Sequence, residues 1–228
     1  MFHAVKRPNV AILASSHQHC LKTLLEANLD NRLCNIKVII SNDASCRELA
    51  NAFNVEFKYF SVTAHNQQNI EGLQIFLLQS LDIDLVILAQ YTPILSPVFH
   101  SVFAGRLITT FSTGSTPFEC SVLQSAQDRG EEVRGVCATY TKDGIKHHEI
   151  ILHDGFIVDI KKTPDQIQKS YFELEADVLL KAVTWHLQGR ILRENGECYV
   201  LDSPANVISF PVKSKLPTYK AEQDSAAG

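Results

Sequence analysis

Long apolar runs are missing from this chain of 228 residues. No stretch reaches the roughly 18 consecutive apolar residues that a membrane-spanning helix needs, so the sequence predicts no membrane partner. The first residues, MFHAVKRPNVAILASS, lead into a predicted strand and lack the apolar core and cleavage site of a secretory signal. We therefore expect the protein to be cytoplasmic.

A strong charge imbalance is missing as well. The chain has 21 Lys and Arg against 25 Asp and Glu, which gives a formal net charge of -4. Proteins that bind nucleic acid or anionic membranes usually carry an excess of basic residues on one face or along one segment. The composition therefore predicts no nucleic-acid partner.

The cysteines and histidines follow no metal-ligand spacing. There is no CxxC pair, so neither a disulfide framework nor a zinc site is indicated, and we expect the thiols to be reduced and mostly buried. His147 and His148 are adjacent, and adjacent side chains of a strand point to opposite faces, which is poor geometry for chelating one ion. The sequence predicts no metal. The six cysteines are Cys20, Cys34, Cys46, Cys120, Cys137 and Cys198.

What the chain does contain is a regular alternation of apolar runs and helix-like segments. Predicted strands cover residues 10–14, 36–40, 55–60 and 85–89, and predicted helices cover residues 19–27, 44–53 and 69–81. The buried face of the helix at residues 69–81 is expected to carry Ile70, Leu73, Leu77 and Leu81. Short connections between such elements favour right-handed crossovers. This predicts an α/β, Rossmann-like fold with a mostly parallel sheet and helices on both faces.

The later part of the chain predicts antiparallel strands. Residues 133–141 and 146–152 alternate around an Asp-Gly hairpin signal at 143–144, and a turn is expected at residues 153–155 before a strand at 156–160. Helices are predicted at 120–129 and 166–188, the second with Thr163 as its cap, followed by a hairpin at 190–201 that turns at Asn195 and Gly196. We expect one domain over residues 1–202 and a C-terminal tail over 203–228 that is partly disordered.

Two turn-rich segments follow neighbouring strands in the middle of the chain. Residues 90–95 follow the apolar run 85–89, and residues 109–117, rich in Thr and Ser, follow Arg106-Leu107-Ile108. Ligands of open α/β sheets bind where parallel strands end, so both segments are expected to line one crevice. A loop rich in hydroxyl groups is also common turn chemistry. Ser96 and Pro97 then predict the cap and first turn of a short helix.

These segments carry a resemblance to a known family. LAQYTPILSP, followed by RLI and a loop, resembles LAxYMxILSP followed by RIINIHHSFLP in formyltetrahydrofolate deformylase, and more loosely the same region of glycinamide ribonucleotide formyltransferase. Residues 15–21, 40–43, 60–63 and 181–201 resemble the deformylase at the same relative positions. The resemblance covers roughly residues 10–201 and implies a formyltransferase-like fold.

The resemblance implies a reduced folate as substrate, either 10-formyl- or 5,10-methylene-tetrahydrofolate. Family members bind the pterin through backbone groups and apolar walls, which survive side-chain replacement. A methylene folate forms an iminium ion that is already electrophilic, so it would need less acid-base help than a formyl folate. The positions that match the pterin-binding segment are Tyr91, Thr92, Pro93, Ile94 and Leu95.

The catalytic set of the family is substituted. The matching positions hold Thr109 for the family's Asn, Phe111 for its His and Lys146 for its Asp, although a local shift of the alignment would bring Asp143 near the last position. Phenylalanine cannot carry a proton, and lysine reverses the charge of a carboxylate. Nearby residues could substitute, yet none has an evident base and orienting partner, so each is more often structural. They are Ser112, Thr113, Cys120, His147 and His148.

Two other departures from the family bear on its substrate and regulation. The turn after the first strand, residues 15–18, has no glycine, whereas the nucleotide formyltransferases bind a substrate phosphate with a glycine-rich turn there. We therefore expect no phosphorylated ribonucleotide as co-substrate. The deformylases usually carry an N-terminal ACT domain, and this chain is expected to start directly with the catalytic-type domain.

Two functions from different classes follow. The first is a divergent folate-dependent one-carbon enzyme that transfers or releases a formyl or methylene unit with altered groups. The second is a non-catalytic folate-binding or interaction protein, in which Phe111 fills the volume of the imidazole. A third, less favoured, is a pocket for a small acid with Lys146 as its cation. Related proteins often associate, so a homo-oligomer is one expected arrangement.

Overall fold

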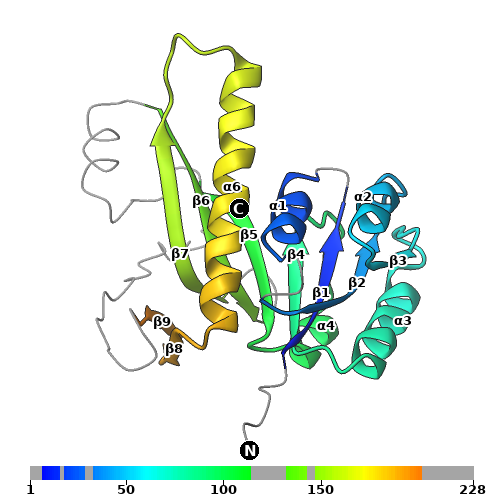
Figure 1. The fold of residues 1–228 in the computed structure, drawn as a ribbon. Helices are drawn as coiled ribbons and strands as arrows, with labels where there is room; N and C mark the ends of the chain where they lie inside the picture. Colours follow the sequence, from blue (N-terminus) through cyan, green and yellow to red (C-terminus); the bar gives the residue numbers. More distant parts are fainter. Residues whose placement is uncertain (1–6, 16–17, 29–32, 114–131, 143–146, 202–228) are drawn as a thin grey trace, which may run out of the picture.

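The computed structural model describes residues 7–15, 18–28, 33–113, 132–142 and 147–201 (Figure 1). Its main sheet has seven strands: β1 Asn9–Ala14, β2 Asn35–Ser41, β3 Glu56–Tyr59, β4 Leu85–Ala89, β5 Leu107–Thr113, β6 Val133–Lys142 and β7 His147–Ile157. Their spatial order is β3-β2-β1-β4-β5-β6-β7. Neighbours from β3 to β5 pair in parallel, and β6 and β7 add in antiparallel pairing. The predicted fold class is confirmed.

Helices cover both faces of this sheet. They are α1 His19–Ala27, α2 Cys46–Ala52, α3 Gln67–Ser80, α4 Pro97–Val102 and α6 Pro164–Leu187. Because successive side chains of a strand point to opposite faces, β1 contributes Val10 and Ile12 to a core beneath α1, α2 and α6, and Ala11 and Leu13 to a core beneath α3 and α4. This two-sided burial explains why β4 and residues 10–14 of β1 are apolar throughout.

Local signals set several of the helix ends and turns. Ser96 accepts a hydrogen bond from the Phe99 amide at the start of α4, and Thr163 forms a capping box with Gln166 at the start of α6. The C-terminal hairpin consists of β8 Ile191–Glu194 and β9 Glu197–Val200. Its two turn residues, Asn195 and Gly196, have φ values of 53° and 82°, as a tight hairpin of this kind requires. The predicted caps and hairpin are confirmed.

The predicted buried face of α3 is wrong at Leu73. Leu73 is 56% exposed and Phe76 is 73% exposed, whereas Glu71, Gln74 and Leu78 are buried. Of the other predicted positions, Ile70 is half-buried, and Leu77 and Leu81 are half-buried and pack against the core. The helix is therefore turned so that polar side chains share its inward face with leucines. Hydrogen bonds to the segment after β4 explain this rotation, as described below.

Two predicted turns are strand instead. Residues 109–113 belong to β5, because β6 supplies a backbone partner for each of them, and threonine suits a pleated strand. The turn expected at residues 153–155 lies inside β7, where Cys137, Val136 and Gly135 of β6 pair with those positions. The predicted helix at 120–129, the turn at 143–144 and the tail at 203–228 lie outside the described residues. Within the described part, no helix is long and apolar enough to span a bilayer.

Candidate functional site

Three polar side chains meet where β1, β2 and β4 end. The Ser15 hydroxyl donates to Asn42 Oδ1 over 2.5 Å and lies 3.1 Å from Thr92 Oγ1, and it also accepts from the Thr92 amide at 3.0 Å. The single hydroxyl proton of Ser15 goes to Asn42, so the Thr92 hydroxyl donates across the 3.1 Å contact. Ser15 thus has its donor and both acceptor sites occupied. It fixes Thr92 in place and is not free to act as a nucleophile.

This cluster lies at the point where the strand order reverses. Strand β1 pairs with β2 along one edge and with β4 along its other edge, and the chain adds β2 and β3 in one direction and β4 and β5 in the opposite direction. The ends of β1 and β4 therefore form the switch point of the parallel sheet. Ligand sites of open α/β sheets lie at such points, outside the carboxyl ends of the strands. The Ser15 cluster therefore marks the mouth of the candidate site.

A second cluster joins the ends of β4 and β5 to α6. Glu175, from the middle of α6, is 6% exposed; it accepts from Gln90 Nε2 at 2.7 Å and from the Thr110 hydroxyl at 2.8 Å. Gln90 has a φ of 56°, a left-handed conformation that is strained for a residue with a side chain. Glu175 thus holds the two predicted mouth segments side by side.

The surroundings of Glu175 keep nearby acids protonated. Burial, followed by the charge of Glu175, raises the pKa of the Cys20 thiol well above its ordinary value. Burial also raises the pKa of Tyr171. A hydrogen bond from Ser112 lowers this pKa in part, and the charge of Glu175 raises it further. Cys20 is consequently a neutral thiol near pH 7 and is excluded as a nucleophile.

The predicted catalytic positions fall on both faces of β5. Thr109 pairs with Leu88 of β4 and Thr139 of β6, and Phe111 pairs with Cys137. By strand alternation, Thr109 and Phe111 face the α4 side with Leu107, whereas Ser112 shares the α6 side with Thr110 and contacts Tyr171. Ser112 is therefore separated from the other two.

The α4 side of β6 carries further polar groups. Thr139 is fully buried, and its hydroxyl has no hydrogen-bond partner among the described residues. Thr141, two residues along, lies 3.0 Å from Nδ1 of the buried His100 of α4. Buried polar groups without partners are rare and call for an explanation. Among the described residues, polar groups on this face include the hydroxyls of Thr109, Thr139 and Thr141 and the His100 imidazole.

The remaining predicted substitutes lie at the ends of β5 and β7 or outside the described residues. Thr113 pairs with Gly135 at the end of β5, and His147 and His148 pair with Lys142 and Thr141 at the start of β7. The side chains of these three predicted residues are outside the described part, as are Cys120 and Lys146 altogether. Among described residues, no group of three or more His, Cys, Asp or Glu side chains could hold a metal ion.

The predicted pterin segment is held at several points. Tyr91 accepts at its hydroxyl from Gln74 Nε2 at 3.1 Å, and burial raises the Tyr91 pKa. Thr92 belongs to the Ser15 cluster, and Pro93 is half-buried. Leu95 is buried in the core beneath α3 and α4, while Ile94 is 74% exposed. The segment thus alternates between anchored and exposed residues.

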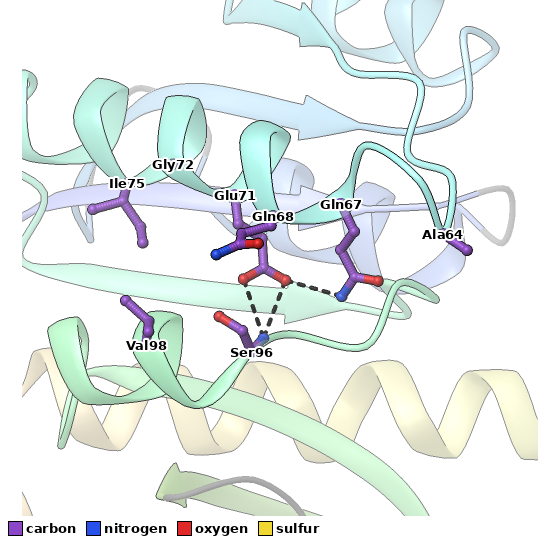
Figure 2. Close-up of a pocket in the computed structure, with 8 residues that line it drawn as sticks. All are labelled: Ala64, Gln67, Gln68, Glu71, Gly72, Ile75, Ser96 and Val98. Atoms are coloured by element: carbon purple, nitrogen blue, oxygen red, sulfur yellow. Dashed lines mark hydrogen bonds between the residues drawn. The ribbon is translucent and has the colours of Figure 1, made fainter.

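A pocket of about 530 Å³ lies between α3 and α4, beside the end of this segment (Figure 2). Its volume is within the range of small-molecule sites. The Glu71 carboxylate points from α3 toward the Ser96 amide at the pocket wall (Figure 2). The lining residues are Ala64, Gln67, Gln68, Glu71, Gly72, Ile75, Ser96 and Val98.

Sequence reasoning missed Glu71, Glu175 and His100, and it placed Gln90 in the mouth without finding its partner. One signal was available for Glu175, which occupies a buried helix position where the helical pattern calls for an apolar residue. Its partners are far away in sequence: Gln90 and Thr110 lie 85 and 65 residues from Glu175. Pattern reading along one segment does not find such pairs.

Comparison with known proteins identifies relatives of the whole described domain. The formyl transferase family model matches residues 8–183. Formyltetrahydrofolate deformylase of Bacillus subtilis is 30% identical over 200 residues, which is 85% of this chain and 65% of that protein. The Mycobacterium bovis deformylase is 31% identical over 204 residues, 86% of this chain and 64% of that protein. The chain thus spans just under two thirds of these relatives.

Solved structures agree on the fold. The crystal structure of formyltetrahydrofolate deformylase from Burkholderia mallei superposes with a TM-score of 0.76 at 26% identity, covering 86% of this chain and 70% of that one. Glycinamide ribonucleotide transformylase 1 from Symbiobacterium toebii gives a TM-score of 0.75 at 20% identity, covering 89% and 98%. The second likeness concerns the fold alone.

Proposed function

This chain belongs to the formyl transferase family, and we propose that it is a folate-dependent enzyme that transfers or releases a one-carbon unit. The observation that carries the proposal is the family match over residues 8–183, which includes both hydrogen-bonded clusters at the strand ends. The substrate in this proposal is 10-formyl- or 5,10-methylene-tetrahydrofolate. A cytoplasmic location, a homo-oligomer and the absence of a nucleic-acid partner stay predictions from the sequence.

The proposed pterin site is the backbone of residues 91–95. Recognition by backbone groups needs a fixed main chain, because a mobile loop loses entropy when it orders around a ligand. Hydrogen bonds at Tyr91, Thr92 and Ser96 supply that rigidity here. The segment keeps the means of binding although the family's catalytic side chains are substituted.

The proposed chemistry uses hydroxyl and imidazole groups. Thr109 and Thr139 lie opposite each other on β5 and β6, and the buried hydroxyl of Thr139 has no hydrogen-bond partner among the described residues. His100 is the imidazole on this face, in contact with Thr141. Such a set can orient a folate and polarise its one-carbon unit, with less acid-base assistance than a His-Asp pair gives.

A non-catalytic folate-binding protein is the second candidate. It is favoured by Phe111, which occupies the position of the family's histidine in a regular strand, half-buried and paired with Cys137. It is also favoured by Thr109, whose hydroxyl donates to the neighbouring Thr110 carbonyl at 3.4 Å. Both positions then have a packing role.

Calorimetric titration with tetrahydrofolate and its 10-formyl and 5,10-methylene derivatives tests the shared premise. Binding of at least one folate is expected, and no heat with any of the three would exclude both candidates. Formate and formaldehyde release by the wild-type protein then separates them: turnover supports the enzyme, and binding without turnover supports the binding protein.

A triple variant, Thr109→Asn, Phe111→His and Lys146→Asp, tests the correspondence of positions. Deformylase activity that appears in this variant and is absent from Thr109→Asn alone would show that these positions surround the one-carbon unit. A variant that binds folate normally and stays inactive would contradict the assignment of the three positions.

A further inference from the structure

The inward face of α3 carries a polar stripe. Gln67, Glu71 and Gln74 are spaced four and three residues apart, so they lie above one another on one side of the helix. Glu71 is 5% exposed and Gln74 is fully buried. A helix that only covered the sheet would bury Leu73 and Phe76, which are exposed here. The polar stripe therefore requires an explanation other than core packing.

The stripe contacts residues 91–96 at three points. Both Glu71 carboxylate oxygens accept from the Ser96 amide, at 3.1 and 3.2 Å, and Gln67 Nε2 donates to Glu71 Oε1 at 3.0 Å and also to the Ile94 carbonyl. Figure 2 shows the hydrogen bonds that join the Glu71 carboxylate to the Ser96 amide and to Gln67. One turn further along α3, Gln74 donates to the Tyr91 hydroxyl. Three points of the segment are thus tied to one helix.

A buried carboxylate is costly unless hydrogen bonds satisfy it. Glu71 receives them from the backbone of the segment and from Gln67, and hydrogen bonds to an ionised acceptor are stronger than neutral ones. On its opposite side the segment is tied to Ser15 through Thr92. The segment is therefore fixed between α3 and the end of β1, at Tyr91, Thr92, Ile94 and Ser96.

We propose that Gln67, Glu71 and Gln74 are positioning residues that hold residues 91–96 in the conformation that binds ligand. Their effect on binding rests on the proposed function, since it takes this segment as the folate site. None of the three needs to touch the folate. Their role is to present the backbone of the segment in one shape, so that the ligand does not have to order it.

Glu71→Leu and Glu71→Gln, with Gln79→Leu as control, test this role. Gln79 is exposed on the same helix, so its replacement by leucine reports any general effect on α3. Loss of a charge-assisted hydrogen bond to the backbone predicts about tenfold weaker folate binding for Glu71→Leu. Glu71→Gln keeps one acceptor oxygen for Ser96 and should recover part of the affinity. Gln79→Leu should bind like the wild type.

Amide hydrogen exchange supplies a readout that does not depend on folate. In Glu71→Leu the Ser96 amide should exchange faster, while amides of β1 and β4 keep their wild-type rates. Wild-type affinity in Glu71→Leu with unchanged Ser96 exchange would overturn the proposal. So would an affinity loss matched by an equal loss in Gln79→Leu.

The Gln74 contact gives an independent check through a double-mutant cycle. Gln74→Leu and Tyr91→Phe each remove one partner of the same hydrogen bond, so their effects on folate affinity should be less than additive. Additive effects would contradict a shared role. Failure of the proposed function looks different: the wild type then binds no folate, while the Ser96 exchange still shows whether Glu71 holds the segment.

Discussion

Replacing Glu175 by leucine should destabilise the protein, and replacing Gln90 as well should restore most of the loss. Glu175 is the acceptor for Gln90 Nε2 at 2.7 Å. The side-chain oxygen of Gln90 is already buried without a partner among described residues. The Glu175→Leu variant therefore leaves the whole side-chain amide of Gln90 unpaired. Changing both residues to leucine removes the unpaired groups together with their partner.

The magnitude follows from the groups left behind. An unpaired buried donor costs about 1–3 kcal/mol, and the half-buried Thr110 hydroxyl can turn toward water at little cost. Removing a buried charge offsets part of this. We expect Glu175→Leu to lower the free energy of unfolding by about 2 kcal/mol and the double variant to lose less than about 1 kcal/mol. The coupling free energy is then more than about 1 kcal/mol, and it grows by whatever Gln90→Leu costs alone.

Urea unfolding followed by circular dichroism measures all four proteins of this cycle. Glu173 is an exposed glutamate on the same helix, so Glu173→Leu combined with Gln90→Leu provides the matched control and should be additive. Additivity within about 0.5 kcal/mol in the Glu175 and Gln90 cycle would refute the proposed dependence of the two mouth segments on this carboxylate.

Three further outcomes are expected. Burial, and then the charge of Arg193, lowers the pKa of His186 below its ordinary value of 6.5, so the unfolded chain binds the proton at a higher pH than the folded protein does. The free energy of unfolding should therefore be at its full value above about pH 6.5 and should fall as the pH drops through the lower folded-state pKa. His186→Leu should flatten this pH dependence in urea titrations. Gly105→Ala should lower the free energy of unfolding by about 1–3 kcal/mol in the same assay, because φ is +76° and a Cβ would collide with the Arg193 guanidinium. Gly72→Ala is the control: a Cβ at this position on α3 meets open space, so the substitution should be neutral or stabilising. Burial raises the pKa of Cys34 to about 11 and of Cys137 to about 12, so iodoacetamide should label these thiols slowly in the native protein and rapidly in urea; fast native labelling would contradict their burial.

The parallel half of the fold could be predicted because its signals are local. Strands β1 and β4 are buried on both faces, so their composition alone identifies them. Ser96 and Thr163 cap their helices through side chains three residues from the amides they bind. The turn at Asn195 and Gly196 likewise depends on two adjacent residues. Each of these features is decided within a few residues of sequence.

The failures come from partners that are distant in the chain. Apolar periodicity in α3 predicts a face with Leu73, but this helix turns inward the side on which Glu71 accepts hydrogen bonds from the Ser96 amide, 25 residues away. The hydroxyl-rich stretch after Ile108 was predicted as a loop, yet a partner strand more than 20 residues later draws it into the sheet. Long-range pairing overrides local preference in both cases.

The same long-range contacts bear on the choice between enzyme and inert scaffold. Ser15, Glu71 and Glu175 each place a polar or charged group in a buried position. Their partners lie after β2 (Asn42), after β4 (Gln90, Thr92 and Ser96) and within β5 (Thr110). Apolar packing of these positions would be at least as stable, since buried charges rarely add net stability. Buried polar groups that converge on one mouth are what a preorganised binding site requires, and sites of this kind reduce stability in return for function. The arrangement therefore favours a mouth that binds a ligand, and under the proposed function the groups around Thr109 and Phe111 would decide what happens to a one-carbon unit.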